Sequence, residues 1–370
     1  MKYGILTLYH DNTNYGANLQ AYALCAICKK YGFNAEQIDY YNGKRIRQVL
    51  SLVYRFVFKK RYYKNNEFYT RKMAIKRFRD SIPHSKTYYR ENLKKANNNY
   101  SGFIVGSDQV WNPEWITDAF ALRFADAKRL RMSYAASIGR INLSNEEKEM
   151  FVSILSQMDY ISVREKNGVE LLSKTTDKKI EWVLDPTLLL SETEWDLIAS
   201  PRKINERYIF CYFLNDYLPH RDFAKQFAMS QGIKIATFPY LSYQMRKSDD
   251  GFGDYQIYDA SPSDFISLIK FADYVFTDSF HATVFCHLYH KEFVVFSQAG
   301  KESRVRMDSL TEMFGTSERH LVGDELLKLE TVAGFSPIDH PENSALFLKM
   351  KAKSIEFLVK SLSSEEADNG

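Results

Sequence analysis

The stretch "YGILTLYHDNTNYGANLQAYALCAICKKYGFNAEQIDY", residues 3–40, contains a complete strand–loop–helix–strand pattern. The apolar run 3–9 predicts a strand, and the polar residues 10–16 predict the loop that follows it. A helix is expected to continue to about Lys30, before a second strand at 34–40. Strands that alternate with helices are typical of parallel sheets, so this stretch predicts an α/β fold.

The same alternation continues along the rest of the chain. Further apolar runs end in polar residues, as in "GFIVGSDQVW", "RMSYAASIG", "DYISVREKNG" and "IEWVLDPT", and the pattern restarts after Ser191 with "RYIFCYFLN", "IKIATFPY" and "DYVFTDS". In the second half, a helix is expected to start with Ser261 as N-cap and Pro262 at its first position. We therefore predict two Rossmann-like, doubly wound domains of similar size that face each other across a cleft, as in the GT-B arrangement.

The expected domains are residues 1–190 and 191–335. The first would carry a basic helical insert at 44–95, and a long helix at 342–363 would pack back on it.

The charge is concentrated in that insert. Residues 44–95 contain 17 Lys and Arg but only 3 Asp and Glu, although the net charge of the chain is +4. Basic segments interleaved with Leu, Val, Phe and Tyr are typical of helices that bind an anionic membrane surface or another polyanion. The alternative is a solvated helical hairpin. The absence of any recognition motif argues against a nucleic-acid partner.

Other features limit the location and cofactors of the protein. The apolar run at the start is too short for a secretory signal, and no window approaches a membrane span, which predicts a cytoplasmic protein. Cys25 and Cys28 form a CxxC pair, but no second pair or histidine lies at zinc spacing, so they are expected in the core. We expect no metal and no bound cofactor.

The candidate site follows from the ends of the strands. Ligands of open α/β sheets bind beyond the carboxyl ends of the strands, and each polar cluster of this sequence follows a predicted strand. The candidates in the first domain are Asn14, Tyr15 and Gly16 after the first strand, Ser107 and Asp108 in "GSDQVW", and Arg164 in "SVRE".

In the second domain the stretch "TDSFHATVFCHLYH", residues 277–290, places three chemically active side chains at a strand end. Ser279 and the free N–H groups of the following helix would form an anion site. His281, in the first turn, could donate or accept a proton. Alternatively, Asp278 or Ser279 only caps the helix and His281 is an ordinary half-buried histidine; His287 and His290 receive only that interpretation.

Arginines are the remaining candidates, because their planar fork binds carboxylate or phosphate bidentately. Arg164 ends a strand, whereas Arg304 and Arg306 follow a loop in which a solvated role is equally compatible with the sequence. No GxGxxG follows the first strand and "GSDQVW" is not a P-loop, which argues against a nicotinamide enzyme.

Taken in order, these motifs resemble the polysaccharide pyruvyl transferase family. The resemblance rests on "GILTLYHDNTNYGANLQAYAL", "VGSDQVWNP", "SYAASIG", "SVRE", "LDPTLLL" and "TDSFHATVFCHLYHKEFVVF", and it extends from residue 4 to about residue 310. It does not explain the basic insert.

The resemblance implies a two-domain enzyme that takes phosphoenolpyruvate as donor and attaches pyruvate as a cyclic ketal to two hydroxyls of a sugar, in bacterial capsule, exopolysaccharide or cell-wall synthesis. The family histidine falls on His281 and a family arginine on Arg164. Some members carry arginine two positions before the histidine, where this chain has Ser279, so Arg164 or Arg304 would meet the donor's charge.

We therefore expect His281 to be the acid, with Asp108 or another residue as base. Phosphoenolpyruvate and a sugar, free or linked to a lipid diphosphate, are the expected partners, together with an anionic membrane surface at 44–95. The alternatives are a GT-B glycosyltransferase that uses a nucleotide sugar and a non-catalytic sugar- or lipid-binding protein.

Overall fold

The computed structural model describes residues 1–46, 66–241, 245–300, 302 and 304–368 of the chain. It forms an α/β fold with two parallel sheets, which confirms the predicted fold class. The chain divides into two compact units, which we treat separately. Unit 1 comprises Met1–Asn66, Arg79–Leu189 and Met350–Gly370, and unit 2 comprises Glu67–Phe78 and Leu190–Lys349.

These bounds differ from the expected domains in the basic insert. The expectation placed all of 44–95 in the first domain, whereas Glu67–Phe78 belongs to unit 2. Arg71 explains this, because it is buried and its guanidinium donates hydrogen bonds to the carbonyl oxygens of Ile257 and Tyr258. Residues 47–65, on which much of the membrane prediction depends, lie outside the described residues.

Unit 1 contains a parallel sheet in the order β2-β1-β5-β6, and single bridges join it to the separate two-stranded sheet of β7 and β8. The elements of this unit are β1 Lys2–Leu6, α1 Tyr15–Lys30, β2 Asn34–Gln37, β3 Tyr40–Tyr41, β4 Tyr88–Tyr89, η1 Leu93–Asn98, β5 Gly102–Val105, β6 Leu130–Ser133, α4 Asn145–Leu155, β7 Ile161–Val163, α5 Lys166–Leu172, β8 Ile180–Trp182 and η2 Pro186–Leu188. Helix α3, Asn66–Ser81, belongs partly to each unit.

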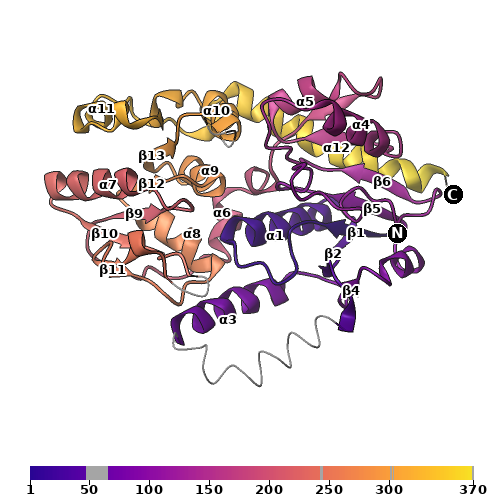
Figure 1. The fold of residues 1–370 in the computed structure, drawn as a ribbon, viewed down its shortest axis with the longest axis horizontal. Helices are drawn as coiled ribbons and strands as arrows, with labels where there is room; N and C mark the ends of the chain where they lie inside the picture. The colour runs from indigo at the N-terminus through magenta and orange to yellow at the C-terminus, as the bar shows by residue number, and fades with distance from the viewer. Residues whose placement is uncertain (47–65, 242–244, 301, 303, 369–370) are drawn as a thin grey trace. The chain divides into compact units, whose positions relative to one another are not determined.

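The last helix, α12 (Ala345–Asp368), returns to unit 1 and lies along it in Figure 1. The Tyr3 hydroxyl at the start of β1 donates a hydrogen bond of 2.8 Å to the Leu362 carbonyl oxygen. The Ser354 hydroxyl accepts from the Leu184 N–H at 2.8 Å. Both bonds are buried, so they fix α12 against the strands of unit 1.

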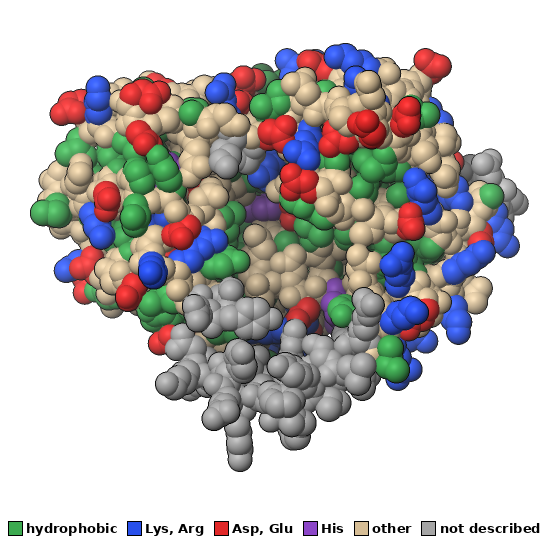
Figure 2. All heavy atoms as spheres, in the orientation of Figure 1, with side chains coloured by type: hydrophobic (Ala, Val, Ile, Leu, Met, Phe, Trp, Pro, Cys, Tyr) green, Lys and Arg blue, Asp and Glu red, His purple; other side chains and the backbone are tan. Residues whose placement is uncertain are grey.

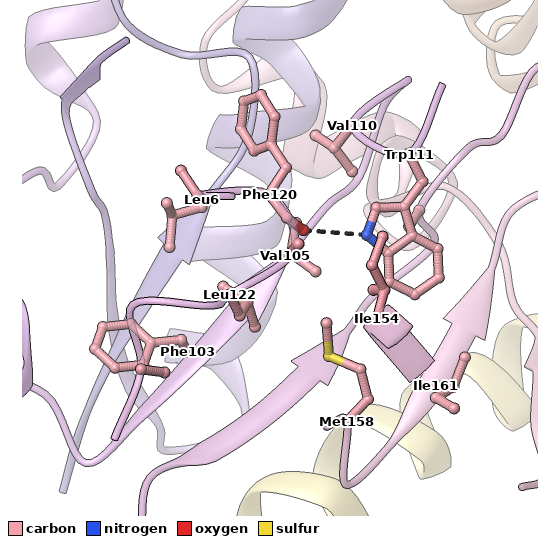
Figure 3. Packing of buried hydrophobic residues seen from close by; sticks show 14 of the residues in the cluster. Leu6, Phe103, Val105, Val110, Trp111, Phe120, Leu122, Ile154, Met158 and Ile161 are labelled. Carbon is pink, nitrogen blue, oxygen red and sulfur yellow. Dashed lines mark hydrogen bonds between the residues drawn. The ribbon is translucent and has the colours of Figure 1, made fainter. Parts of the chain in front are cut away.

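The core of unit 1 lies between the sheet and the segments that follow β5 and β6. Figure 3 shows part of it: Leu6, Phe103, Val105, Val110, Trp111, Phe120, Leu122, Ile154, Met158 and Ile161. The indole N–H of the buried Trp111 donates to the Phe120 carbonyl oxygen at 3.1 Å, drawn as a dashed line in Figure 3. A buried indole normally has such a partner, so the loop after β5 is anchored to the core immediately beyond Ser107 and Asp108.

Unit 2 contains a six-stranded parallel sheet in the order β11-β10-β9-β12-β13-β14. Its elements are α6 Glu192–Asp196, β9 Tyr208–Tyr212, α7 Leu218–Gln231, β10 Lys234–Thr237, η3 Lys247–Asp249, β11 Tyr255–Gln256, α8 Pro262–Phe271, β12 Tyr274–Thr277, α9 Phe280–Leu288, β13 Glu292–Ser297, α10 Arg304–Met313, η4 Ser317–Arg319, β14 His320–Val322, η5 Asp324–Leu326, α11 Leu329–Ala333 and η6 Pro341–Asn343. This is the doubly wound strand order, and it reverses between β9 and β12.

Local sequence signals account for several helix ends of unit 2. Ser261 caps α8 and forms a reciprocal capping box with Asp264, and Pro262 occupies the first helical position, which confirms the prediction. Helix α7 ends at Gly232, whose φ of 62° is in the left-handed region that glycine tolerates best.

Two further sequence expectations concern cysteines and charge. Cys25 and Cys28 are buried within α1, and burial raises the pKa of the Cys25 thiol to about 12.

Among the described residues, no group of three or more His, Cys, Asp or Glu could hold a metal ion. In the same part of the chain, no helix combines the length and apolarity needed to cross a bilayer. Figure 2 shows basic and acidic side chains interspersed on the visible face of each unit.

Candidate functional site

In unit 1 the strand order reverses between β1 and β5, and the predicted polar residues follow these two strands. Asn14 is the N-cap of α1, and its side-chain oxygen accepts a hydrogen bond from the Ala17 N–H at 3.0 Å. Tyr15 and Gly16 form the buried first turn of this helix. The three residues therefore build a helix N-terminus at the carboxyl edge of the sheet, where anions are favoured.

The loop after β5 carries Ser107 and Asp108 close to the same edge. Gly106 has a φ of 120°, and a Cβ at this position would lie 2.2 Å from the Tyr134 carbonyl oxygen, so only glycine fits. The Ser107 carbonyl oxygen accepts from the Thr7 hydroxyl at 2.8 Å. This bond joins the loops that follow the two strands at the switch point.

Asp185 links Ser107 to Arg164 in a buried network. One carboxylate oxygen of Asp185 lies 2.9 Å from the Ser107 hydroxyl and 2.9 Å from a guanidinium nitrogen of Arg164. The other oxygen accepts from the backbone N–H and the hydroxyl of Thr187, at 3.0 and 2.6 Å. The side chains of Arg164 and Asp185 are only 2% and 0% exposed, so this ion pair is shielded from solvent.

Arg164 also pairs with the neighbouring Glu165, with 3.1 Å between the two charged groups. Burial disfavours the charged form of Arg164, but Glu165, Asp185 and Asp108 outweigh it and raise the pKa of the guanidinium above its ordinary value. Arg164 is therefore a permanently charged member of an internal network that holds the loop carrying Ser107.

Asp185 is not among the residues predicted from the sequence, although it lies in the segment "IEWVLDPT". The available signal was a carboxylate directly after the apolar run 180–184 and directly before a proline. Its position after β8 places it at the same sheet edge as Arg164, which follows β7.

In unit 2 the switch point lies between β9 and β12, and Asp278 joins the loops that follow these strands. Its two carboxylate oxygens accept from the backbone N–H groups of Leu214 and Asn215, at 2.6 and 2.8 Å. Burial raises the pKa of Asp278 above its ordinary value, while the two N–H groups act in the opposite direction. Asp278 therefore fixes the position of the loop after β9 relative to the loop after β12.

Ser279 and His281 open α9 at the same switch point. The Ser279 hydroxyl caps the helix by accepting from the Ala282 N–H at 3.4 Å. His281 is the second residue of α9 and is 6% exposed, and its ring lies edge-on to that of Phe280. Ser279 therefore caps α9, and both Ser279 and His281 lie at the start of this nine-residue helix.

Arg304 is exposed and begins α10, where it pairs with Asp308 at 3.1 Å. Asp308 also accepts from His320 at 2.9 Å, and the opposite ring nitrogen of His320 lies 2.8 Å from the Ser297 hydroxyl. Arg304 therefore ends a hydrogen-bonded chain that reaches the carboxyl end of β13. The sequence identified Arg304 but not the other three members of this chain, Asp308, His320 and Ser297.

Asp278→Asn tests the connection between the two loops of unit 2. An amide has one acceptor oxygen, so it leaves one of the two N–H groups without its partner, and we expect a cost of about 1–3 kcal/mol. Hydrogen exchange read by mass spectrometry should become faster in the peptide that contains Leu214 and Asn215. The exposed Asp250→Asn is the control, and equal protection in both variants would contradict the role of Asp278.

The family model described as polysaccharide pyruvyl transferase matches residues 14–299, well over half of the chain. The chain belongs to the polysaccharide pyruvyl transferase family. The matched range of this family includes Ser107, Arg164 and Asp185 of unit 1 and His281 of unit 2.

Solved structures resemble the chain in fold. The UDP-GlcNAc 2-epimerase from Methanocaldococcus jannaschii has a TM-score of 0.61 at 12% identity, over 98% of this chain and 100% of that one. The epimerase from Neisseria meningitidis bound to UDP-GlcNAc has a TM-score of 0.54 at 12% identity, with the same coverage. The wall teichoic acid polymerase TagF has a TM-score of 0.51 at 12% identity, over 100% of this chain and 89% of that one.

These likenesses show that this pyruvyl transferase family member has a fold of the GT-B kind. No curated protein sequence matches the chain significantly.

Proposed function

We propose that the protein transfers the enolpyruvyl group of phosphoenolpyruvate to two hydroxyls of a sugar, as a cyclic ketal, in the synthesis of a bacterial capsule, exopolysaccharide or cell-wall glycan. The observation that carries this proposal is the family match over residues 14–299, which spans the polar strand ends of both units. It is supported by chemistry suited to an anionic donor, namely two capped helix N-termini at sheet edges.

In this proposal His281 protonates the methylene carbon of phosphoenolpyruvate, which leaves a positive centre at C2. One sugar hydroxyl attacks C2 and loses its proton. The C2–O bond to phosphate then breaks with its electron pair, and the second hydroxyl closes the ketal. One hydroxyl proton replaces the proton that His281 gave, and the other leaves with phosphate.

Other residues bind and orient the donor in this proposal. Ser279 and the first turn of α9 meet an anionic group of phosphoenolpyruvate, and the exposed Arg304 supplies a further positive charge. Arg164 acts through Asp185 by holding the loop of Ser107 and Asp108, rather than by reaching the donor, because its guanidinium is buried against two carboxylates. Asn14, Tyr15 and Gly16 contribute the N-terminus of α1.

Phosphate release from phosphoenolpyruvate tests the reaction directly. The purified protein would be given galactosides, glucosides and N-acetylmannosamine conjugates, free and linked to a lipid diphosphate, with products weighed by mass spectrometry. We expect acceptor-dependent phosphate and a product heavier by one pyruvyl ketal. An inert phosphoenolpyruvate, together with sugar transfer from a nucleotide sugar, would overturn the proposal in favour of a glycosyltransferase, which the likeness to structures with bound UDP-GlcNAc makes the second candidate.

The basic segment 44–95 suggests that the protein binds its acceptor sugar at a membrane surface. We propose that the basic segment 44–95 binds an anionic membrane surface on the cytoplasmic side, at about 1 kcal/mol per well-placed Lys or Arg. Arg71 does not contribute, because it is buried in unit 2. Sedimentation with vesicles that contain anionic lipid at low salt should remove the protein from solution, and a protein that stays in the supernatant would exclude this surface.

A further inference from the structure

His10 and Asp39 form a short hydrogen bond at the carboxyl edge of the unit 1 sheet. His10 follows β1 and Asp39 follows β2, and these strands are parallel neighbours. The His10 Nδ1 atom lies 2.6 Å from one carboxylate oxygen of Asp39. Neither residue is needed by the proposed function as described above, and the family match begins at residue 14, beyond His10.

Asp39 is itself held in place by the segment before β4. Its second carboxylate oxygen accepts from the Thr87 hydroxyl at 2.5 Å, its N–H donates to the Ser85 hydroxyl at 3.1 Å, and its carbonyl oxygen accepts from the Tyr88 N–H at 2.7 Å. The Asp39 carboxylate has one partner on each oxygen, and its backbone is fixed by two further hydrogen bonds, so it has one orientation. The orientation of the His10 ring is fixed with it.

The bond determines which ring nitrogen of His10 carries the proton. Burial opposes ionisation of Asp39, but the hydrogen bonds from His10 and Thr87 outweigh it and lower the pKa of Asp39. An ionised carboxylate only accepts hydrogen bonds, so neutral His10 carries its proton on Nδ1. The lone pair of Nε2 then points away from Asp39, which is the arrangement of a general base oriented by a carboxylate.

The His10 ring is partly exposed at this edge. The His10 side chain is 18% exposed, in contrast to the nearly buried Arg164. The ring of Tyr41 packs edge-on against it at 5.3 Å between centroids and supports one face. β1 also borders the switch point, since β5 pairs with it on the side opposite β2, so His10 lies at the edge where ligands of such sheets bind.

We propose that His10 is the general base that takes the proton from the acceptor sugar hydroxyl, with Asp39 as its positioning residue. This rests on the proposed pyruvyl transfer. As the hydroxyl oxygen forms its bond to C2 of the donor, its O–H bond breaks and the proton moves to Nε2 of His10. The imidazolium is stabilised by Asp39 and later returns this proton to solvent, from which His281 regains the proton that it gave to carbon. The proton of the second hydroxyl is taken up by the released phosphate when the ketal closes.

The test compares His10→Ala, His10→Gln and Asp39→Asn with wild type in ketal formation. We expect kcat to fall about a hundredfold in both His10 variants and about tenfold or more in Asp39→Asn, with an unchanged Kd for phosphoenolpyruvate by calorimetry. Added imidazole should restore part of the kcat of His10→Ala but not of His10→Gln, because only alanine leaves room for the base. A purely structural role would not give this rescue.

His84→Gln is the matched control, since His84 lies in the same unit but bonds through Nδ1 to the Ile82 carbonyl oxygen rather than to a carboxylate. It should keep the wild-type kcat. Ketal formation by wild type with an undiminished kcat in His10→Gln would overturn the role of His10 alone. Absence of any ketal with wild type would overturn the pyruvyl transfer, and this inference with it.

Discussion

The variant His281→Ala should lose about 10²–10⁴-fold in kcat for ketal formation, because a positioned acid contributes about that much to a rate. The step that His281 serves is proton transfer to carbon, for which water is a poor substitute. The Kd for phosphoenolpyruvate should change little, since the cap by Ser279 and the N–H groups of α9 remain. Single-turnover phosphate release would separate the chemical step from binding.

His290→Asn is a suitable control for this variant. His290 follows α9 and has a φ of 51°, a conformation that asparagine tolerates. Thermal unfolding should coincide for wild type, His281→Ala and His290→Asn, and only His281→Ala should lose activity. A folded His281→Ala protein with wild-type kcat would remove His281 from the mechanism.

The second large effect concerns stability. Replacing Asp185 by Ala should lower the free energy of unfolding of unit 1 by about 3–5 kcal/mol, because it breaks the buried ion pair between Asp185 and Arg164. It also removes the acceptor shared by Ser107 and Thr187. Urea unfolding followed by tryptophan fluorescence would report this, since Trp111 and Trp182 belong to unit 1.

Asp118→Asn provides the comparison within the same unit. Asp118 pairs with Arg123 at 3.6 Å, but both side chains are exposed, so its loss should change the free energy by less than about 1 kcal/mol. If the two variants were equally stable, the Arg164–Asp185 pair would have no special importance for unit 1.

The sequence predicted the type of fold and the edge on which the polar residues lie, because both follow from local patterns. Apolar runs that end in Ser107, Arg164 or Ser279 identify strand ends, and parallel strands bring those ends to one edge. The capping of α8 by Ser261 is equally local. These features need no knowledge of how distant segments pack.

The contacts within the site were beyond such reasoning. The pairs Arg164–Asp185 and His10–Asp39 join residues from different strands, and their partners depend on the orientation of side chains after the sheet has formed. The position of Arg164 at a strand end therefore did not reveal that its guanidinium is buried against Asp185. The basic helix gave no sign that Arg71 would be buried in unit 2, because an amphipathic pattern does not tell whether a helix packs on protein or on a membrane surface.

The return of α12 to unit 1 has a consequence for the order of events during synthesis. Tyr3 and Leu362, which share a hydrogen bond, are 359 positions apart, so the first strand emerges from the ribosome long before the helix that covers it. Unit 1 must stay incomplete while all of unit 2 is made. Such non-local closure slows folding and leaves apolar strands exposed to aggregation in the interval, so unit 1 begins to form before unit 2 is made and is completed only after it.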